Sequence, residues 1–304
     1  MHSSSTSLVA TRRRSGTGRS HLISSGVLWG TGGLLGTLFG RTAGLSPVAV
    51  ATYRLVIGGA VLVLPLILSE QSIPRTRGAW VRITVLGLLF AVYQACYFEA
   101  VSLSSVSLAT LVAIGMAPVL VLAAERLRGR RRTDGRMVRV ICLAIAGLGL
   151  LVGVPTGQVA PIAALASAGL ALLSAAGFAA VTLLGARPVP GLHERSAVGL
   201  AFAFGGFLLA AFTAATTGLT FSPSVHAIGL LAALGVGPTA AAYALYFRGL
   251  RSVNASTAAV LALLEPLTAA LLAALVLGDR LGLTGIAGAA LLAASLIVTA
   301  RRMR

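Results

Sequence analysis

The stretch PIAALASAGLALLSAAGFAAVTLLG, residues 161–185, decides the fold class, because it is apolar and carries no charged side chain. Roughly 20 such residues in an α-helix cross the hydrocarbon core of a bilayer, which is about 30 Å thick. The whole chain shares this character, since 57% of its residues are hydrophobic and only 10% are charged. A soluble domain has about a quarter of its residues charged. The sequence therefore predicts an all-α integral membrane protein.

Ten segments are long and apolar enough to be membrane spans. They cover residues 22–40, 46–68, 79–100, 104–125, 137–154, 161–185, 196–217, 225–247, 255–278 and 282–300. Residues 1–20 are rich in Ser, Thr, Gly and Arg and are predicted to form a disordered cytoplasmic tail. We expect the first segment to be retained as a helix, because no signal-peptidase site of the A-x-A type follows it.

The arginines test this count of spans. All 24 basic residues are arginine, and with the N-terminus placed inside, 21 of them lie in inside segments. Only Arg41 and Arg280 lie outside, and Arg54 lies within a span. Because cytoplasmic loops of membrane proteins are enriched in basic residues, this distribution predicts ten spans with both termini cytoplasmic. The expected location is the inner membrane of a bacterium, with the lipid bilayer as partner.

Composition also excludes several functions. The pI near 11.8 does not indicate a nucleic-acid partner, because the arginines lie in short runs between apolar blocks and not on one solvated face. A P-loop ATPase needs a lysine that this chain lacks. The two cysteines form no CxxC pair and the four histidines are scattered. We therefore predict no metal and no cofactor.

The two halves of the chain resemble each other at an offset of about 148 residues. Tyr97-Phe98, a polar break and an apolar run to Pro118 recur as Tyr246-Phe247, a polar break and a run to Pro266. The halves, residues 21–154 and 161–300, hold five segments each, and an odd number of crossings forces the second copy into the opposite orientation. Inverted repeats around a central site are a recurring design of secondary transporters.

The residues that carry this repeat also resemble a known family. YQACYFEAV (93–101), followed by SSVSLATLVAIGMAPVLV (104–121), is similar to the first half of the EamA family of the drug/metabolite transporter superfamily. LLEPLTAALLAALVLGDRL (263–281) resembles its second half. The resemblance implies a ten-helix carrier of two inverted five-helix repeats, without enzymatic activity, that often exports amino acids or related metabolites.

Two charged residues lie inside predicted spans. Arg54 is in the second and Glu265 is near the centre of the ninth. A charge at mid-membrane costs about 2.5–3.5 kcal/mol on insertion scales, so both should face the bundle interior. Arg54 either binds a substrate carboxylate or serves a structural ion pair or snorkels to the surface. Glu265 either forms a proton or amine site or packs beside a kink. The two depths permit pairing.

Prolines and small residues mark further candidates. Pro118 and Pro266 occupy corresponding places in the fourth and ninth spans, and Pro238 lies in the eighth. Interrupted helices at matching positions indicate a hinge or a binding cavity in a carrier. The alternative is that proline is simply common in membrane helices. Glycines at a spacing of four predict close helix packing: Gly26, Gly30, Gly32, Gly36 and Gly40.

Tyrosines gather on two of the predicted spans. Tyr93 and Tyr97 share a face of the third span, flanked by Gln94, while Tyr243 and Tyr246 share a face of the eighth. They either line a cavity for an amphipathic substrate or form an interfacial aromatic belt, which suits Tyr97 and Tyr246 near their helix ends.

These features predict a secondary carrier that moves a small-molecule substrate by alternating access, with protons as a candidate coupling ion through Glu265. The alternative is an intramembrane lipid-modifying enzyme. Such an enzyme needs several polar groups clustered at one depth. A lateral groove with clustered acids or histidines would favour the enzyme, and a central cavity between the halves would favour the carrier.

Overall fold

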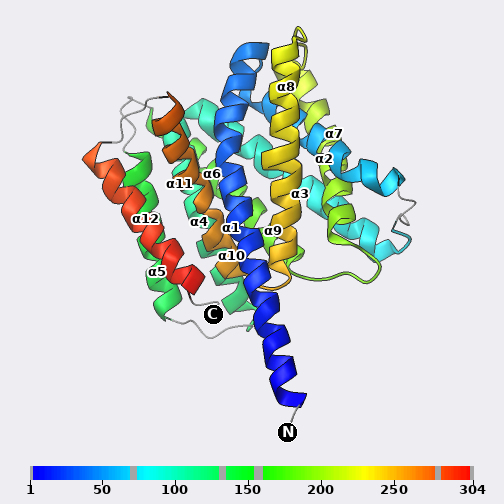
Figure 1. The fold of residues 1–304 in the computed structure, drawn as a ribbon. Coiled ribbons are helices and arrows are strands. Elements are labelled where there is room, and N and C mark those ends of the chain that lie inside the picture. The colour runs from blue at the N-terminus through cyan, green and yellow to red at the C-terminus, as the bar shows by residue number, and fades with distance from the viewer. Residues whose placement is uncertain (1–2, 69–73, 130–134, 154–159, 278–281, 302–304) are drawn as a thin grey trace.

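The computed structural model describes residues 3–68, 74–129, 135–153, 160–277 and 282–301, and within these ranges the chain is helical with no strand (Figure 1). The elements are α1 (Ser3–Ala43), α2 (Pro47–Leu68), α3 (Arg77–Leu103), α4 (Val106–Leu127), α5 (Gly135–Val152), α6 (Pro161–Gly185), α7 (Glu194–Thr216), α8 (Val225–Leu234), η1 (Gly235–Ala241), α9 (Ala242–Leu250), α10 (Ala255–Ala262), α11 (Leu264–Leu272), η2 (Ala273–Leu277) and α12 (Leu283–Arg301).

The described residues contain ten helical segments long and apolar enough to cross a membrane, which confirms the predicted number of spans. The eighth span joins α8, the π-helix η1 and α9, and the ninth joins α10, α11 and the π-helix η2. The predicted tail differs, because α1 begins at Ser3 and residues 3–20 are helical. Once a helix is nucleated, each added residue gains a hydrogen bond, and no proline interrupts this segment.

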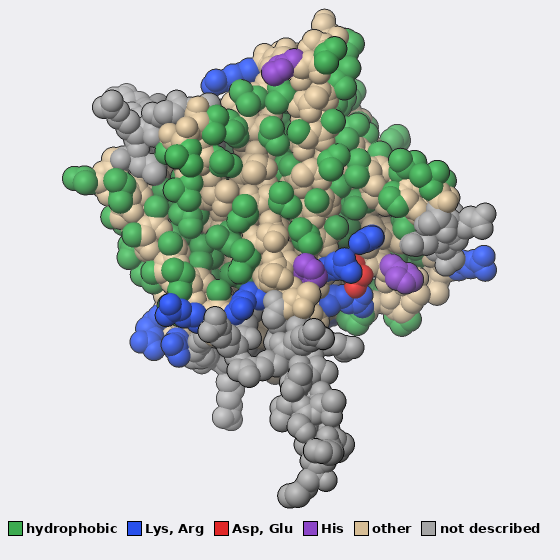
Figure 2. Space-filling view, viewed as in Figure 1, with side chains coloured by type: hydrophobic (Ala, Val, Ile, Leu, Met, Phe, Trp, Pro, Cys, Tyr) green, Lys and Arg blue, Asp and Glu red, His purple; other side chains and the backbone are tan. Residues whose placement is uncertain are grey.

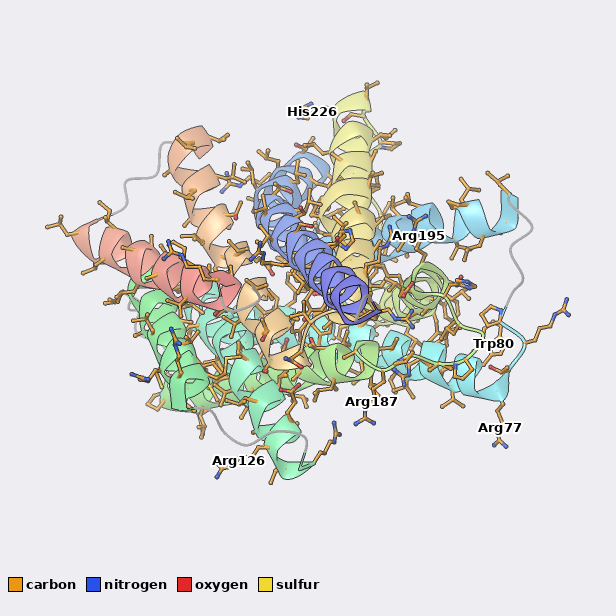
Figure 3. The ribbon with its side chains drawn as sticks, turned by 60° about the horizontal axis from the view of Figure 1, so that its bottom comes forward. Arg77, Trp80, Arg126, Arg187, Arg195 and His226 are labelled. Carbon is orange, nitrogen blue, oxygen red and sulfur yellow. The ribbon has the colours of Figure 1, made fainter. Side chains whose placement is uncertain are left out.

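The surface has the polarity of a membrane protein. Apolar side chains cover the middle of the molecule and basic side chains gather at one end (Figure 2). The helix α1 begins at this end and α12 finishes there (Figure 1). Viewed onto this end, Arg77, Arg126 and Arg187 lie around its edge, whereas His226 lies at the far end (Figure 3). The predicted loop arginines Arg130–Arg132 and Arg280 lie outside the described residues.

Packing between the halves follows the inverted repeat. The second spans of the two halves, α2 and α7, pack on each other, and so do the fifth, α5 and α12. The other contacts pair different spans of the two halves. The helix α3, in the third span, packs on α6, the first span of the second half, and its repeat counterpart α9 packs on α1, the first span of the first half. Each half therefore completes the other, and neither forms a separate bundle.

Glycines allow these helices to touch through their backbones. A Cβ atom at Gly147 of α5 would lie 2.6 Å from the backbone nitrogen of Leu292 and 2.9 Å from the carbonyl oxygen of Gly288 on α12. A Cβ at Gly205 of α7 would lie 2.5 Å from the carbonyl oxygen of Gly87 on α3. Small residues at such crossings maximise van der Waals contact in lipid, where helices gain little from hydrophobic burial.

The ninth span is broken beside its proline. Pro266 has no N–H to donate to the carbonyl of Ala262, and α10 ends at that residue. The next helix, α11, begins at Leu264 and carries Glu265 in its first turn. The fourth span has no such break, because Pro118 lies within the continuous helix α4, and a hinge at Pro118 stays a prediction. Proline is tolerated within membrane helices when neighbouring groups adjust.

Pro238 explains the π-helix in the eighth span. It lies inside η1 and leaves the carbonyl of Leu234 without its helical donor. The hydroxyl of Thr239 donates to that carbonyl at 2.8 Å. The carbonyl of Leu234 therefore receives a hydrogen bond from the same chain. Backbone polar groups at membrane depth need such partners because lipid offers none.

We expect Gly147→Ala to destabilise the protein by about 1–3 kcal/mol, because the added methyl group has no space at the α5–α12 crossing. Thermal unfolding in detergent micelles measures the effect. The matched control is Gly149→Ala two residues away, where the nearest atom to the new Cβ, on Leu111, is 3.8 Å distant. That change should be neutral or stabilising, since alanine favours helix. Equal melting temperatures for the two variants would contradict this packing.

Candidate functional site

A cavity of about 630 Å³ lies between the two halves of the molecule. Its walls come from α1, α2, α3 and α4 of the first half and mainly from α6, α9, α10 and α11 of the second. Pockets of this volume hold small organic molecules. The cavity therefore has the size of a metabolite site, which is much larger than a bare ion needs.

The cavity reaches one end of the bundle. Gly44 and Leu45, in the connection between α1 and α2, and Pro47, the first residue of α2, form part of its wall. This connection lies at the end opposite the start of α1 (Figure 1). In the other direction the lining includes Trp29, Tyr243 and, on α10, Ala262 and Ala259. The molecule is thus open toward the end that is remote from the basic rim.

Packed aromatic rings close the cavity on the basic side. The ring centroid of Trp29 lies 4.9 Å from that of Tyr243 and 4.8 Å from that of Tyr246. Phe202 lies 4.6 Å from Phe90 and 4.8 Å from Tyr243. All five rings are buried. Edge-to-face contacts of this kind add to area burial and form a dense floor.

Most of the predicted substrate residues meet at this cavity. Its lining includes Arg54, Tyr93, Gln94, Tyr97, Tyr243 and Glu265. They come from four spans, which the bundle brings together around one cavity. The sequence placed each of them inside a span but did not show that they face each other.

Tyr246 and the three prolines do not line the cavity. Tyr246 is 1% exposed and its hydroxyl lies 2.9 Å from that of Thr182, so the interfacial-belt alternative is wrong for this residue. Tyr97 lines the cavity and its hydroxyl lies 2.8 Å from that of Thr110. Pro118, Pro238 and Pro266 lie outside the lining and shape only the helices that carry it.

The two halves meet directly at the floor. The hydroxyls of Tyr93 on α3 and Tyr243 on α9 are 2.5 Å apart. Ser174 on α6 donates to the backbone carbonyl of Tyr93 at 2.9 Å. These contacts fix the tyrosines across the repeat boundary.

Arg54 and Glu265 face the same cavity without forming an ion pair. Among the described residues the one ion pair is between Arg251 and Glu194, at the basic end. Arg54 and Glu265 are near enough to interact electrostatically. The first-turn position in α11 also favours a carboxylate at Glu265, because a helix N-terminus carries partial positive charge. The site therefore offers one cation and one acid to a ligand.

Three buried N–H donors at the cavity have no acceptor in the described part of the chain. They are Nε of Arg54, Nε2 of Gln94 and Nε1 of Trp29. Gln94 is 5% exposed and Trp29 is 4% exposed. A buried donor without an acceptor costs roughly 1–3 kcal/mol. An acceptor-rich ligand group would satisfy these donors, so the arrangement points to an oxygen-bearing solute.

Sequence reasoning missed part of this lining. Trp29, Ser174 and Phe178 all line the cavity. Trp29 had a usable signal, because tryptophan in membrane proteins prefers the interface and this one lies well inside the first span. Ser174 and Phe178 had none, since isolated serines and phenylalanines are common in membrane helices.

The α1 glycines serve two purposes. Gly26 and Gly30 pack against α11, where added Cβ atoms would approach Leu264 and Thr268. Gly32 and Gly40 also pack closely, since added Cβ atoms would lie 3.2 Å from Pro238 and 3.3 Å from Val50, and together with Gly36 they line the cavity as well.

A multi-pass bundle of two five-helix repeats enclosing a metabolite-sized cavity has the architecture of a membrane carrier. The chain belongs to the EamA-like transporter family, whose model matches residues 17–153 and again 165–301. The protein is therefore a membrane transporter.

Two known proteins show how far the similarity extends. The chain is 29% identical over 272 residues to a Bacillus subtilis (strain 168) protein named "Uncharacterized transporter YwfM", with 89% of each chain covered. A protein crystal structure shares the fold with a TM-score of 0.78 at 20% identity, covering 93% of this chain and 96% of that one.

The unpartnered donor of Gln94 gives a test that separates ligand binding from stability. We expect Gln94→Met to leave the melting temperature unchanged or higher, because it removes a buried group that lacks an acceptor. The matched control is Thr52→Val, which removes a buried hydroxyl 2.8 Å from that of Thr213 and should cost about 1 kcal/mol. Thermal unfolding in detergent compares them. A clear loss of stability in Gln94→Met would show that the amide serves the fold.

Proposed function

We propose that this transporter is a secondary carrier that exports a small amphipathic metabolite, an amino acid or a related compound, across the bacterial inner membrane by alternating access. The observation that carries the proposal is the central cavity between the two halves, which reaches the end remote from the basic rim and is lined by Arg54 and Glu265. With the basic rim on the cytoplasmic side, the cavity corresponds to the outward-facing state of a carrier, in which the site exchanges solute with the outside. The export direction rests on the resemblance to the family.

The charges support a zwitterionic cargo. Arg54 can bind a carboxylate through two parallel hydrogen bonds. The unpartnered N–H donors of Gln94 and Trp29 can bind further oxygen atoms of the same solute. Glu265 supplies the complementary site for an ammonium group. Because neither charge is neutralised by the other, a solute that carries both signs satisfies both.

The intramembrane enzyme has less support. Among the described residues no group of three or more His, Cys, Asp and Glu side chains lies close enough to hold a metal ion. The cavity lies centrally between the halves, and the family of the chain consists of transporters.

Transport of amino acids in proteoliposomes tests the proposed function. We expect Arg54→Gln and Glu265→Gln each to lower the rate by roughly thirtyfold or more, because loss of one partner of a buried charged contact costs about 2–5 kcal/mol. The control is Glu99→Gln on the exposed part of α3 outside the cavity lining, which should transport normally. Normal rates in both cavity variants would remove these residues from the site.

Proton coupling through Glu265 is tested by imposing a pH gradient on the same vesicles. We expect the gradient to accelerate transport by wild type and to have no effect on Glu265→Gln, because glutamine cannot carry a proton across the cycle. Counterflow at equal pH on both sides shows whether the variant still binds and exchanges the solute. A wild-type rate that is insensitive to the gradient would exclude proton coupling.

A further inference from the structure

One wall of the cavity is bare helix backbone. Gly33, Gly36 and Gly40 all line it, and they follow Trp29 along the same side of α1. A Cβ atom at Gly33 would meet no atom within 4 Å. At Gly36 and Gly40 an added Cβ would lie 3.5 Å and 3.3 Å from the side chain of Val50. The glycines therefore leave a slot between α1 and α2 that ordinary side chains would fill.

Polar and apolar groups occupy different depths of this cavity. Arg54, Gln94 and Glu265 lie toward the floor, where the aromatic rings close it. Toward the mouth the facing wall is apolar, as Val101 of α3 lies about 10 Å beyond Gln94 at 1.5 Å per residue. Val50, Phe98 and Ile114 continue this apolar wall. On α1, Thr37 and Arg41 also line the mouth. A solute with a polar head and an apolar body fits with its head near Arg54 and Glu265 and its body against this apolar wall.

We propose that the cargo binds with its charged head on the floor and its apolar body in the slot beside α1, and that Gly33 sets the upper limit on the size of that body. The proposal rests on the carrier function proposed above. Gly33 lies one helical turn above Trp29, so the first carbons beyond the head group lie against it. Any side chain at this position would enter the volume that the body of the cargo occupies.

Gly33 can be substituted without disturbing the packing of the helices. Since an added side chain meets open space, Gly33→Ala and Gly33→Leu should fold, unlike changes at the packed Gly30, where Thr268 stands in the way. A matched control exists in Gly229 of α8, which is exposed, also has no atom within 4 Å of an added Cβ, and does not line the cavity. Gly229→Leu therefore carries the same chemical change without narrowing the slot.

The test measures the rates at which proteoliposomes transport alanine, norvaline, norleucine and phenylalanine. We expect Gly33→Leu to retain alanine transport while the rate for phenylalanine falls by roughly tenfold to a hundredfold relative to it, as found when a pocket loses room for a few carbons. Gly33→Ala should lie between, and Gly229→Leu should match wild type. An unchanged size preference in Gly33→Leu, or an equal loss for all four solutes, would overturn the proposal.

A second measurement needs no cargo. In a Cys96→Ser, Cys142→Ser background, Gly33→Cys should react with a small water-soluble methanethiosulfonate reagent much faster than Ser25→Cys, because Ser25 on the same helix is fully buried. Equal, slow labelling would overturn the slot. If wild type transports none of the four amino acids while Gly33→Cys labels rapidly, the proposed amino-acid carrier fails and the open slot stands.

Discussion

A charge inside a bilayer must be given a polar surrounding, and the interior of this protein depends on that constraint. Arg54 and Glu265 lie within membrane spans, where contact with hydrocarbon would cost each of them about 2.5–3.5 kcal/mol on insertion scales. Both line the central cavity and form no ion pair with each other. The bundle must therefore remain hollow at this depth, and its helices must be held together by contacts elsewhere.

Those contacts are glycine crossings at the periphery of the cavity. The backbones of α5 and α12 touch at Gly147 and Gly288, and those of α3 and α7 touch at Gly87 and Gly205. In lipid, close backbone contact replaces the hydrophobic effect as the source of helix association. Glycines therefore serve two purposes in this protein: at the helix crossings they allow backbone contact, and along α1 they leave space for the cavity.

The irregular helices meet the same constraint at the level of the backbone. Pro266 ends α10 and lets α11 begin just before Glu265, so that the carboxylate stands at the positive end of a helix. Pro238 widens the eighth span, and Thr239 satisfies the carbonyl that is left free. Backbone of this kind is tolerated at membrane depth where protein groups or a cavity take the place of lipid.

Hydropathy was sufficient for the spans and for the charged residues, because both signals reside in composition along the chain. It was insufficient for the cavity, since a helix that is apolar all round has no polar face to tell which side turns inward. Gly26 and Gly36 both stand four residues from another glycine, yet one packs on α11 and the other lines the cavity. Pro118 and Pro266 match in the repeat, but only one interrupts its helix.

The repeat-related tyrosines show why internal symmetry misleads at the site itself. Tyr97 lines the open cavity, whereas its counterpart Tyr246 is buried in the aromatic floor. Two halves with one pattern place the same residue in opposite surroundings when the molecule is open on one side and closed on the other. A carrier that alternates access needs this asymmetry, because the state open to the other side follows when the halves exchange conformations. The difference between Tyr97 and Tyr246 is thus what the proposed mechanism requires of a single conformational state.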